Sequence, residues 1–320
     1  MAKILEIKDL KLSFETEEGT VEALDGVYLD VEEGHFHGLI GETGCGKSIT
    51  GLTVIGLLDN NARIERGEVL FRGRDLLKFT EKQFQQAIRG KEVAMVFQDP
   101  ASSLDPVFSI KDQMLEAVRL NRKETKQSNE RVVKELLNKV KLPDVESLLE
   151  KYPHQLSGGM KQRVMIAMML GRNPSMLIAD EPTTALDVSI QAQFLRILMD
   201  LKKTTNLTVL YITHNLAVLT EICDEVSVMY AGRIVETASI GDVFHNPSHP
   251  YTRKLVNSIL RADSTLDSLE EIPGSVPRLI NPPPGCRFHP RCEEAVDECS
   301  RVVPPVKEIG TNHLVACLRR

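Results

Sequence analysis

Eight residues near the start of the chain have the composition of a phosphate-binding loop: Gly41 to Ser48 read GETGCGKS. Their spacing, Gly41-x4-Gly46-Lys47-Ser48, satisfies the P-loop (Walker A) pattern. Glycines let backbone N–H groups converge on phosphate oxygens, and the helix N-terminus that follows adds a favourable dipole. We expect Lys47 to reach the β- and γ-phosphates of a nucleotide and Ser48 to ligate Mg²⁺. The full predicted set is Gly41, Glu42, Thr43, Gly44, Cys45, Gly46, Lys47, Ser48 and Ile49.

Cys45 is the unusual member of this loop. Because the loop binds phosphate through backbone N–H groups, a cysteine there should cost little binding. Its thiol would, however, be open to oxidation.

Two adjacent carboxylates, Asp180 and Glu181, end the apolar run that starts at Met176. A carboxylate at the C-terminal edge of a strand near a P-loop is suited to hold Mg²⁺, usually through water. Glu181 would then polarise the attacking water as general base. Without the P-loop, the pair would equally well be a surface acidic turn before Pro182.

The elements that position these residues follow from hydrophobic periodicity. Apolar residues alternate with polar ones between Leu10 and Val31, which predicts antiparallel strands with one solvated face. The runs Met176 to Asp180 and Leu207 to Thr213 lack alternation, as expected of parallel strands buried on both faces. Helical patterns such as Ile190 to Lys203 lie between strands, so the sequence predicts α/β architecture.

Two further zones complete the predicted organisation. The segment from Gln98 to Leu156 is mostly helical and predicts a helical subdomain, at about 99–165, inserted in a nucleotide-binding domain of residues 1–240. Residues 241–320 form a C-terminal extension, with a helix around Tyr251 to Leu260 and then a proline-rich stretch leading to four cysteines.

Composition limits the classes of function. The chain has 320 residues, 42% of them hydrophobic and 26% charged, as in an ordinary soluble globular protein. Its net charge of −6 gives no global basic field for nucleic acid. The start is not a signal peptide, and the longest apolar stretch, Val164 to Leu170, is too short to span a bilayer. We expect a cytosolic protein whose membrane role, if any, comes through a partner.

A second glycine motif, LSGGMKQR, runs from Leu156 to Arg163. Ser157, Gly158 and Gly159 precede a predicted helix (Lys161 to Leu170), which makes another helix N-terminus able to contact a γ-phosphate. A lone SGG would be a helix cap. Together with the P-loop, the motif resembles the ABC-transporter signature, whose commonest form ends in Gln where this chain has Met160. The resemblance covers about residues 4 to 240. It implies a P-loop NTPase fold of the ABC type and a head-to-tail dimer in which the signature faces the partner's P-loop.

The same resemblance implies roles for single residues. Gln98, in MVFQDP, resembles the Q-loop glutamine that senses Mg²⁺ and the attacking water. Asp187 lies in a D-loop-like ALD, and His214 resembles the switch histidine that contacts the γ-phosphate. Phe14 resembles the aromatic residue that stacks on adenine, although it also suits a strand core.

Three features resemble ATPase subunits of dipeptide and oligopeptide importers: Met160, NPSHPYTRKL (246–255), and the tail NPPPGCRFHPRCEEAVDEC. The resemblance implies an ATPase that energises two separate membrane permease subunits at the cytoplasmic face, with an extracytoplasmic peptide-binding protein as indirect partner. A second ATPase subunit, identical or different, completes the dimer. Alternatives are an importer of nickel or another small solute, a soluble ABC-type ATPase outside transport, and an iron–sulfur sensor that nucleotide regulates.

Four of the six cysteines lie in the tail, as Cys286-x5-Cys292-x6-Cys299-x17-Cys317. Clustered thiols in a reducing compartment favour a metal site over disulfides. The quartet has no CxxC pair of the kind common in structural zinc sites, and a [4Fe–4S] cluster tolerates varied spacing. We therefore expect a [4Fe–4S] cluster, with Zn²⁺ and unligated thiols as the alternatives. His289 and His313 are expected to be surface imidazoles.

Overall fold

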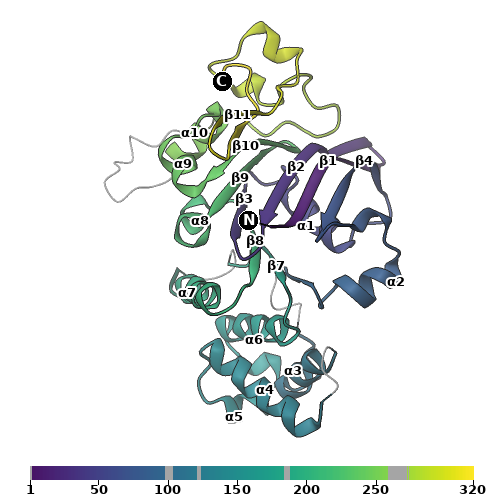
Figure 1. The fold of residues 1–320 in the computed structure, drawn as a ribbon, viewed down its shortest axis with the longest axis vertical. Coiled ribbons are helices and arrows are strands. Elements are labelled where there is room, and N and C mark those ends of the chain that lie inside the picture. The colour runs from purple at the N-terminus through teal and green to yellow at the C-terminus, as the bar shows by residue number, and fades with distance from the viewer. Residues whose placement is uncertain (1, 98–103, 121–123, 184–187, 259–271, 273) are drawn as a thin grey trace. The chain divides into compact units, whose positions relative to one another are not determined.

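The computed structural model describes residues 2–97, 104–120, 124–183, 188–258, 272 and 274–320. The chain divides into two compact units, Met1–Phe79 with Leu210–Arg320, and Thr80–Val209. Figure 1 labels the elements along the chain. Among the described residues, no helix is both long and apolar enough to cross a membrane. The predicted boundary between a nucleotide-binding domain (1–240) and a C-terminal extension (241–320) stays a prediction.

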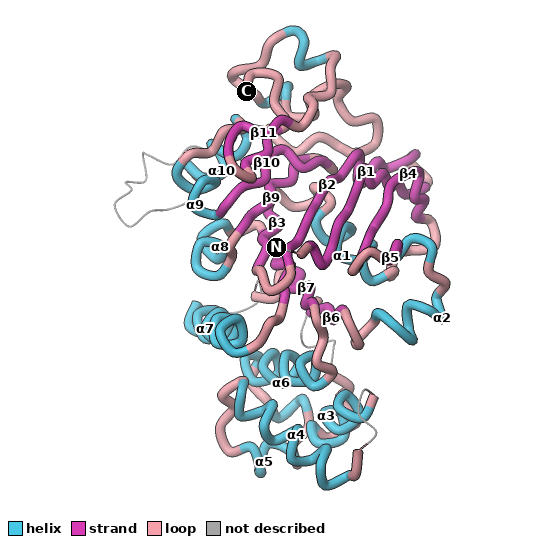
Figure 2. The backbone as a smooth tube through the Cα atoms, in the orientation of Figure 1, coloured by secondary structure: helices cyan, strands magenta, loops and turns pink. Residues whose placement is uncertain are grey.

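The first unit contains a four-stranded antiparallel sheet, visible in Figure 2. Its strand order is β2 (Gly19–Glu32), β1 (Lys3–Thr16), β4 (Ala62–Phe71) and β5 (Arg74–Asp75). The alternating apolar residues of β1 and β2 are buried on one face, since Leu10, Leu12 and Val27 have no solvent exposure. This confirms the antiparallel strands predicted for the N-terminus.

The strands of a second sheet that belong to this unit form both parallel and antiparallel pairs. The central strand β3 (Phe36–Ile40) runs parallel to β9 (Glu225–Tyr230), which pairs antiparallel with β10 (Arg233–Ser239). The sheet then continues through β12 (His313–Val315) to the outer strand β11 (Lys307–Gly310). Strand β8 (Thr208–Thr213) is buried throughout, as its continuous apolar run predicts.

Helices of the first unit follow its strands. Helix α1 (Lys47–Ile55) comes directly after the phosphate-loop motif, and α8 (Leu216–Ile222) follows β8. Helices α9 (Ile240–His245) and α10 (Pro250–Asn257) lead into the C-terminal part, and a short turn, η1 (Leu76–Lys78), follows β5. Helix α10 ends before the predicted Leu260, which lies outside the described residues.

The second unit contains a helical bundle and a parallel strand pair. Strands β6 (Val93–Val96) and β7 (Met176–Asp180) are parallel and fully buried. The helices α3 (Ile110–Arg119), α4 (Lys126–Lys139), α5 (Val145–Leu149) and α6 (Gly158–Gly171) lie between them in the chain, as predicted for an inserted helical segment. The other helical elements are α2 (Glu81–Gln83), η2 (Phe84–Ile88), η3 (Pro153–Gln155) and α7 (Val188–Thr204).

The start of α6 corrects one prediction. The helix begins at Gly158, not at Lys161, so both glycines form its first turn. The physical reason is the N-cap: the Ser157 hydroxyl accepts a hydrogen bond from the Met160 N–H at 3.3 Å, which satisfies a free backbone donor of the first turn.

The extension after residue 274 consists mainly of loops with two short turns, η5 (His289–Arg291) and η6 (Asp297–Ser300). His313 corrects the expectation of a surface imidazole, because it is buried and its Nε2 lies 2.7 Å from Glu236 Oε1. The same Glu236 carboxylate accepts hydrogen bonds from the backbone N–H groups of Ser248 and His249. His289 is half-buried, with Nδ1 2.9 Å from the Cys286 carbonyl oxygen.

Candidate functional site

The phosphate-loop motif connects β3 to α1 in the first unit, the strand–loop–helix context that its pattern requires. The Lys47 side chain is 5% exposed, and its ammonium donates hydrogen bonds to the Gly41 and Glu42 carbonyl oxygens at 2.8 and 3.0 Å. A Cβ on Gly41 would lie 2.1 Å from the Met229 carbonyl oxygen. Gly46, the N-cap of α1, has φ +109°, which strongly favours glycine. The loop therefore forms a close-fitting backbone cradle at a helix N-terminus, which fits a nucleotide phosphate.

Cys45 does not match the expectation of an oxidation-sensitive thiol. Its side chain is fully buried, and burial raises the pKa of the thiol. A protonated, inaccessible thiol is a poor nucleophile.

The carboxylates Asp180 and Glu181 lie at the C-terminal end of β7 in the second unit. Asp180 is buried, and Glu181 is half-buried with a left-handed backbone, φ +45°. Such a conformation is uncommon for a residue with a Cβ and often occurs at functional sites. The Gln162 amide of α6 donates a hydrogen bond to the Pro182 carbonyl oxygen, so the helix that follows the signature is tied to the carboxylate turn.

The signature residues have different surroundings within this unit. Ser157 and Gly158 are exposed, whereas Gly159 is buried. A Cβ on Gly159 would lie 2.9 Å from the Ile190 side chain, so the absence of a side chain lets α6 and α7 approach closely. The exposed N-terminus of α6 is thus accessible to a ligand or another chain.

The remaining predicted residues are distributed as follows. His214 is exposed directly after β8, and Phe14 is half-buried in β1, where it pairs with Val21 and Ala62. That position is compatible with both roles considered for Phe14. Gln98 and Asp187 lie outside the described residues.

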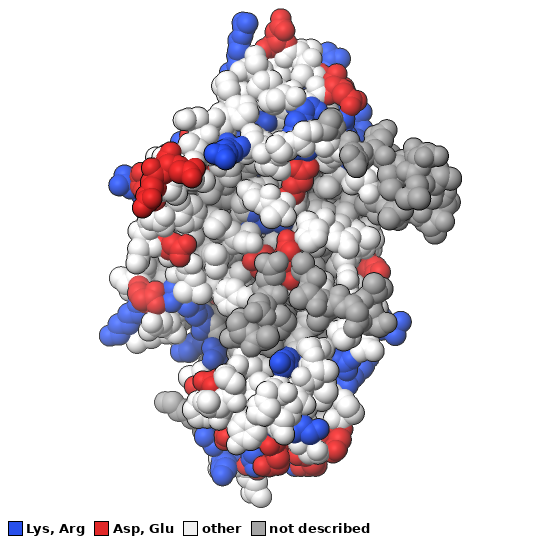
Figure 3. Space-filling model, turned by 180° about the vertical axis from the view of Figure 1, so that it is seen from behind, with Lys and Arg blue, Asp and Glu red and all other residues white. Residues whose placement is uncertain are grey.

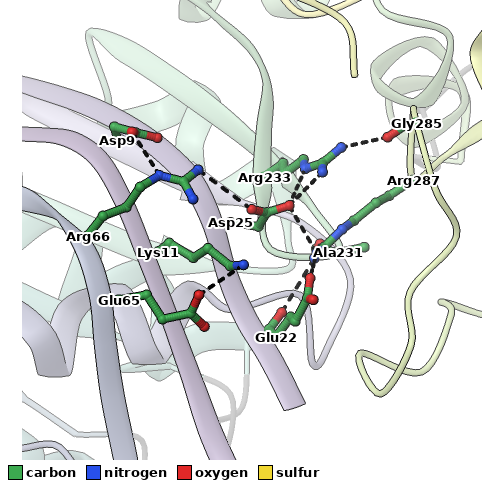
Figure 4. A network of polar contacts seen from close by, with 10 residues as sticks. All are labelled: Asp9, Lys11, Glu22, Asp25, Glu65, Arg66, Ala231, Arg233, Gly285 and Arg287. Carbon is green, nitrogen blue, oxygen red and sulfur yellow. Dashed lines mark hydrogen bonds and ion pairs between the residues drawn. The ribbon is translucent and has the colours of Figure 1, made fainter. Parts of the chain in front are cut away.

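A polar network that sequence reasoning missed ties the extension to the rest of the first unit (Figure 4). Arg233 donates to Asp25 at 2.9 Å and to the Gly285 carbonyl oxygen at 2.6 Å. Arg287, with a side chain only 2% exposed, donates to the Ala231 carbonyl oxygen at 2.6 Å and forms ion pairs with Asp25 and Glu22. Burial works to raise the pKa of Asp25, but the hydrogen bond and charge of Arg233, with the charge of Arg287, lower it overall.

The four cysteines of the extension are all free thiols. Burial, with smaller effects from the thiols of Cys299, Cys317 and Cys292, raises the pKa of Cys286 to about 11. No group of three or more His, Cys, Asp or Glu side chains among the described residues has an arrangement that could hold a metal ion.

The fold and these sites define a P-loop nucleotide-binding protein. Family models extend this result: a model described as "ABC transporter" matches residues 24–184, and one described as "Oligopeptide/dipeptide transporter, C-terminal region" matches residues 235–299. The chain belongs to the ABC transporter family, and the predicted fold class and family resemblance are confirmed.

Individual relatives agree with this assignment. The chain is 46% identical, over 99% of its length and 95% of the relative, to a probable peptide ABC transporter ATP-binding protein, y4tR, of Sinorhizobium fredii. It is 42% identical, with the same coverage, to the dipeptide transport ATP-binding protein DppD of Bacillus subtilis. A dimeric structure of the ATP-binding cassette MJ0796 bound to ADP and Pi matches with a TM-score of 0.65 and 26% identity, over 74% of this chain and 98% of that one.

Proposed function

We propose that this chain is the ATP-binding and ATP-hydrolysing subunit that energises import of dipeptides or oligopeptides through separate membrane permease subunits. The observation that carries this proposal is the presence, on one chain, of an ABC cassette and an oligopeptide/dipeptide transporter C-terminal region. The names of relatives that are 41–46% identical over nearly the whole chain support the peptide substrate.

ATP and Mg²⁺ are the cofactors of this activity, and the fit of the phosphate loop supports the assignment of their ligands. The P-loop backbone and Lys47 would hold the β- and γ-phosphates, and Ser48 and Asp180 would hold Mg²⁺, which neutralises charge on the phosphates. Glu181 would take a proton from the attacking water, while His214 and Gln98 orient the γ-phosphate and that water. Phe14 would stack on adenine.

A dimer completes each site in this proposal. Ser157, Gly158 and Gly159, with Asp187, would contact the nucleotide held by the partner's P-loop. The exposure of Ser157 and Gly158 at a helix N-terminus supports this role, as does the dimeric structure of the MJ0796 cassette. The partner ATPase is a second copy or a related chain.

The other partners follow from the transport role. Two membrane permease subunits bind the chain at the cytoplasmic face, so it is a peripheral protein, and an extracytoplasmic peptide-binding protein acts indirectly. Nucleic acid is not an expected partner: the net charge is −6, and acidic and basic side chains are interspersed on the face shown in Figure 3.

Reconstitution of the chain with its permeases in vesicles tests the function. We expect ATP hydrolysis to be stimulated by a peptide-loaded binding protein and coupled to peptide uptake. Stimulation by a nickel-loaded binding protein, with no response to peptides, would support the alternative of a nickel importer instead.

For the extension we propose that Cys286, Cys292, Cys299 and Cys317 hold a [4Fe–4S] cluster, with Zn²⁺ as the alternative. The chemistry of the donor set supports this proposal, since one segment of the chain carries four free thiols. Iron and sulfide analysis of anaerobically purified protein, with single Cys→Ser variants, tests it. Colourless protein with stoichiometric zinc would refute the cluster.

A further inference from the structure

The second residue of the phosphate loop, Glu42, is held by the C-terminal extension. Arg291 lies in η5 and donates to both carboxylate oxygens of Glu42: Nη1 is 2.8 Å from Oε2, and Nη2 is 3.2 Å from Oε1. The side chains are 8% and 24% exposed, respectively. A two-pronged, mostly buried contact of this kind fixes both orientation and distance.

Arg291 is itself fixed by several other contacts. Its Nη1 lies 3.3 Å from the Tyr230 hydroxyl, and its guanidinium lies 5.7 Å from the centre of the Tyr230 ring. Its Nη2 also donates to the carbonyl oxygens of Ile272 and Gly274, at 3.2 and 3.3 Å. The guanidinium is therefore held in place by partners other than Glu42 and is preorganised to bind the Glu42 carboxylate.

A second group holds the backbone of Glu42. Its N–H donates to the Tyr251 hydroxyl at 3.1 Å. Tyr251 is fully buried, with ring centres 4.7 Å from Tyr230 and 5.4 Å from Phe288 of the extension. Burial raises the pKa of Tyr251 far above its ordinary value, so the hydroxyl stays neutral.

Glu42 also contacts Lys47, the lysine proposed to bind phosphate. The Glu42 carbonyl oxygen accepts a hydrogen bond from the Lys47 ammonium at 3.0 Å. A displacement of Glu42 therefore moves an acceptor of Lys47 and the backbone N–H groups of the loop.

We propose that Arg291 and Tyr251 are positioning residues for the ATP site, and that the extension sets ATP affinity through Glu42. The inference rests on the phosphate-binding role of the loop proposed above. The competing explanation is that the Arg291–Glu42 pair only attaches the extension to the rest of the first unit.

The main test is the Arg291→Gln variant of the full-length protein. We expect the Kd of Mg-ATP, measured by calorimetry, to rise about tenfold, which corresponds to about 1.4 kcal/mol. The kcat at saturating ATP should stay within about twofold, because none of the proposed hydrolytic residues is touched. Arg291→Lys, which keeps the charge but not the fork, should recover part of the affinity.

The matched control is Arg320→Gln. Arg320 forms an ion pair with Glu294 at 2.7 Å within the extension and makes no contact with the loop among the interactions described. We expect its Kd for ATP to equal that of the wild type even if its Tm falls. Equal losses of affinity in R320Q and R291Q would mean that the Arg291 pair acts only through stability, which overturns the proposal.

Glu42→Gln gives a second test, because the two explanations predict opposite changes in the affinity of this variant for ATP. If Glu42 acted only through its charge, removal of a negative charge beside a triphosphate would strengthen ATP binding. If Glu42 is positioned by Arg291, E42Q binds ATP more weakly than the wild type. A variant with both E42Q and R291Q then binds ATP no more weakly than the single variant with the lower affinity. Tighter binding by E42Q, or wild-type affinity in R291Q, contradicts the inference. Loss of ATP binding by Lys47→Ala separately tests the role of the loop.

Discussion

Glu181 is the proposed general base, so the proposed chemistry depends on it most directly. It follows a buried aspartate at the end of β7 and has a left-handed backbone, φ +45°. Such a backbone is uncommon for a residue with a Cβ and is often found at functional sites, which supports the proposed role.

We expect Glu181→Gln to lower kcat by a hundredfold or more, about the contribution of a general base. The Kd of ATP should remain close to that of the wild type, since the amide keeps the shape of the carboxylate. Phosphate release measures kcat, and equilibrium ATP binding measures the Kd. Glu146→Gln, at an exposed position of α5, is the control, and normal turnover by E181Q would remove Glu181 from the role of base.

Gly41 supports a prediction about the loop itself. An alanine there would bring Cβ to 2.1 Å from a backbone oxygen, which cannot move cheaply. We expect Gly41→Ala to lower the free energy of unfolding by about 1 to 3 kcal/mol and to abolish ATP binding. Gly158→Ala, where a Cβ has nothing within 4 Å, should keep its stability in the same denaturant titration.

At this scale the sequence predicts those residues whose chemistry depends on local spacing. The phosphate loop, Asp180 and Glu181 were found in this way. Arg291 and Tyr251 were missed, because their partner Glu42 is some two hundred residues away and no local pattern records the contact. The only signal was that NPSHPYTRKL and the CRFHPRC segment resemble one family of tails.

Among the elements, those with strong periodicity were predicted well. Strands β7 and β8 are continuous apolar runs, and β1 and β2 alternate. The strands β11 and β12 were not predicted, because segments of four and three residues carry no periodic signal. Their pairing with β10 depends on contacts distant in sequence.

His249 is the N-cap of α10, where its Nδ1 accepts a hydrogen bond from the Tyr251 N–H at 3.1 Å, and it gives a pH-dependent prediction. Burial, reinforced by Arg253 and Arg320, lowers the pKa of His249 to about 3 from an ordinary 6.5. Below pH 6.5 only the unfolded chain takes up this proton, so stability falls as the pH falls. From pH 6.5 to 5 the loss should approach about 2 kcal/mol.

His249→Asn, which retains a side chain able to cap the helix, should remove this part of the pH dependence. Urea titrations of both proteins at pH 7 and pH 5 measure the difference. An identical pH slope in the variant and the wild type would show that His249 is not the group responsible.

Asp25 gives a second prediction for the attachment of the extension. Asp25→Asn should lower the free energy of unfolding at pH 7 by about 2 to 3 kcal/mol, the scale of hydrogen bonds to charged groups. Since the pKa of Asp25 is lowered from 3.8, its contribution is present above that value and disappears as the pH falls below it. The difference in the free energy of unfolding between Asp25→Asn and the wild type should therefore become smaller at acidic pH. Lys3→Gln, which removes an exposed pair with Asp30, should change stability little.

The whole molecule is expected to work as a dimer. In the presence of Mg-ATP, the E181Q protein should form a dimer, because it binds ATP without hydrolysing it. Light scattering should then show a doubled molecular mass. Adding Ser157→Arg should keep it monomeric, since a bulky cation would occupy the exposed N-terminus of α6. Glu146→Arg is the control for an added surface charge. Dimerisation of the Ser157→Arg variant would contradict the proposed interface.

At this scale the order of motifs was enough to predict the family. The P-loop alone indicates only nucleotide binding, and the carboxylates and the signature are ambiguous without it. The sequence shows that four cysteine donors are present, but it does not predict whether they bind a metal. Ligation depends on where the loops of the extension place the sulfur atoms.

The outer strand of the second sheet has a consequence for solubility. Strand β12 covers the free edge of β10, and β11 covers β12. The last strand, β11, is short, fully exposed and carries Lys307 and Glu308, features that discourage pairing with another molecule. A chain cut after residue 240 would instead offer β10 as an uncovered template for aggregation. In the folded chain, the tail thus protects this edge of the cassette from self-association.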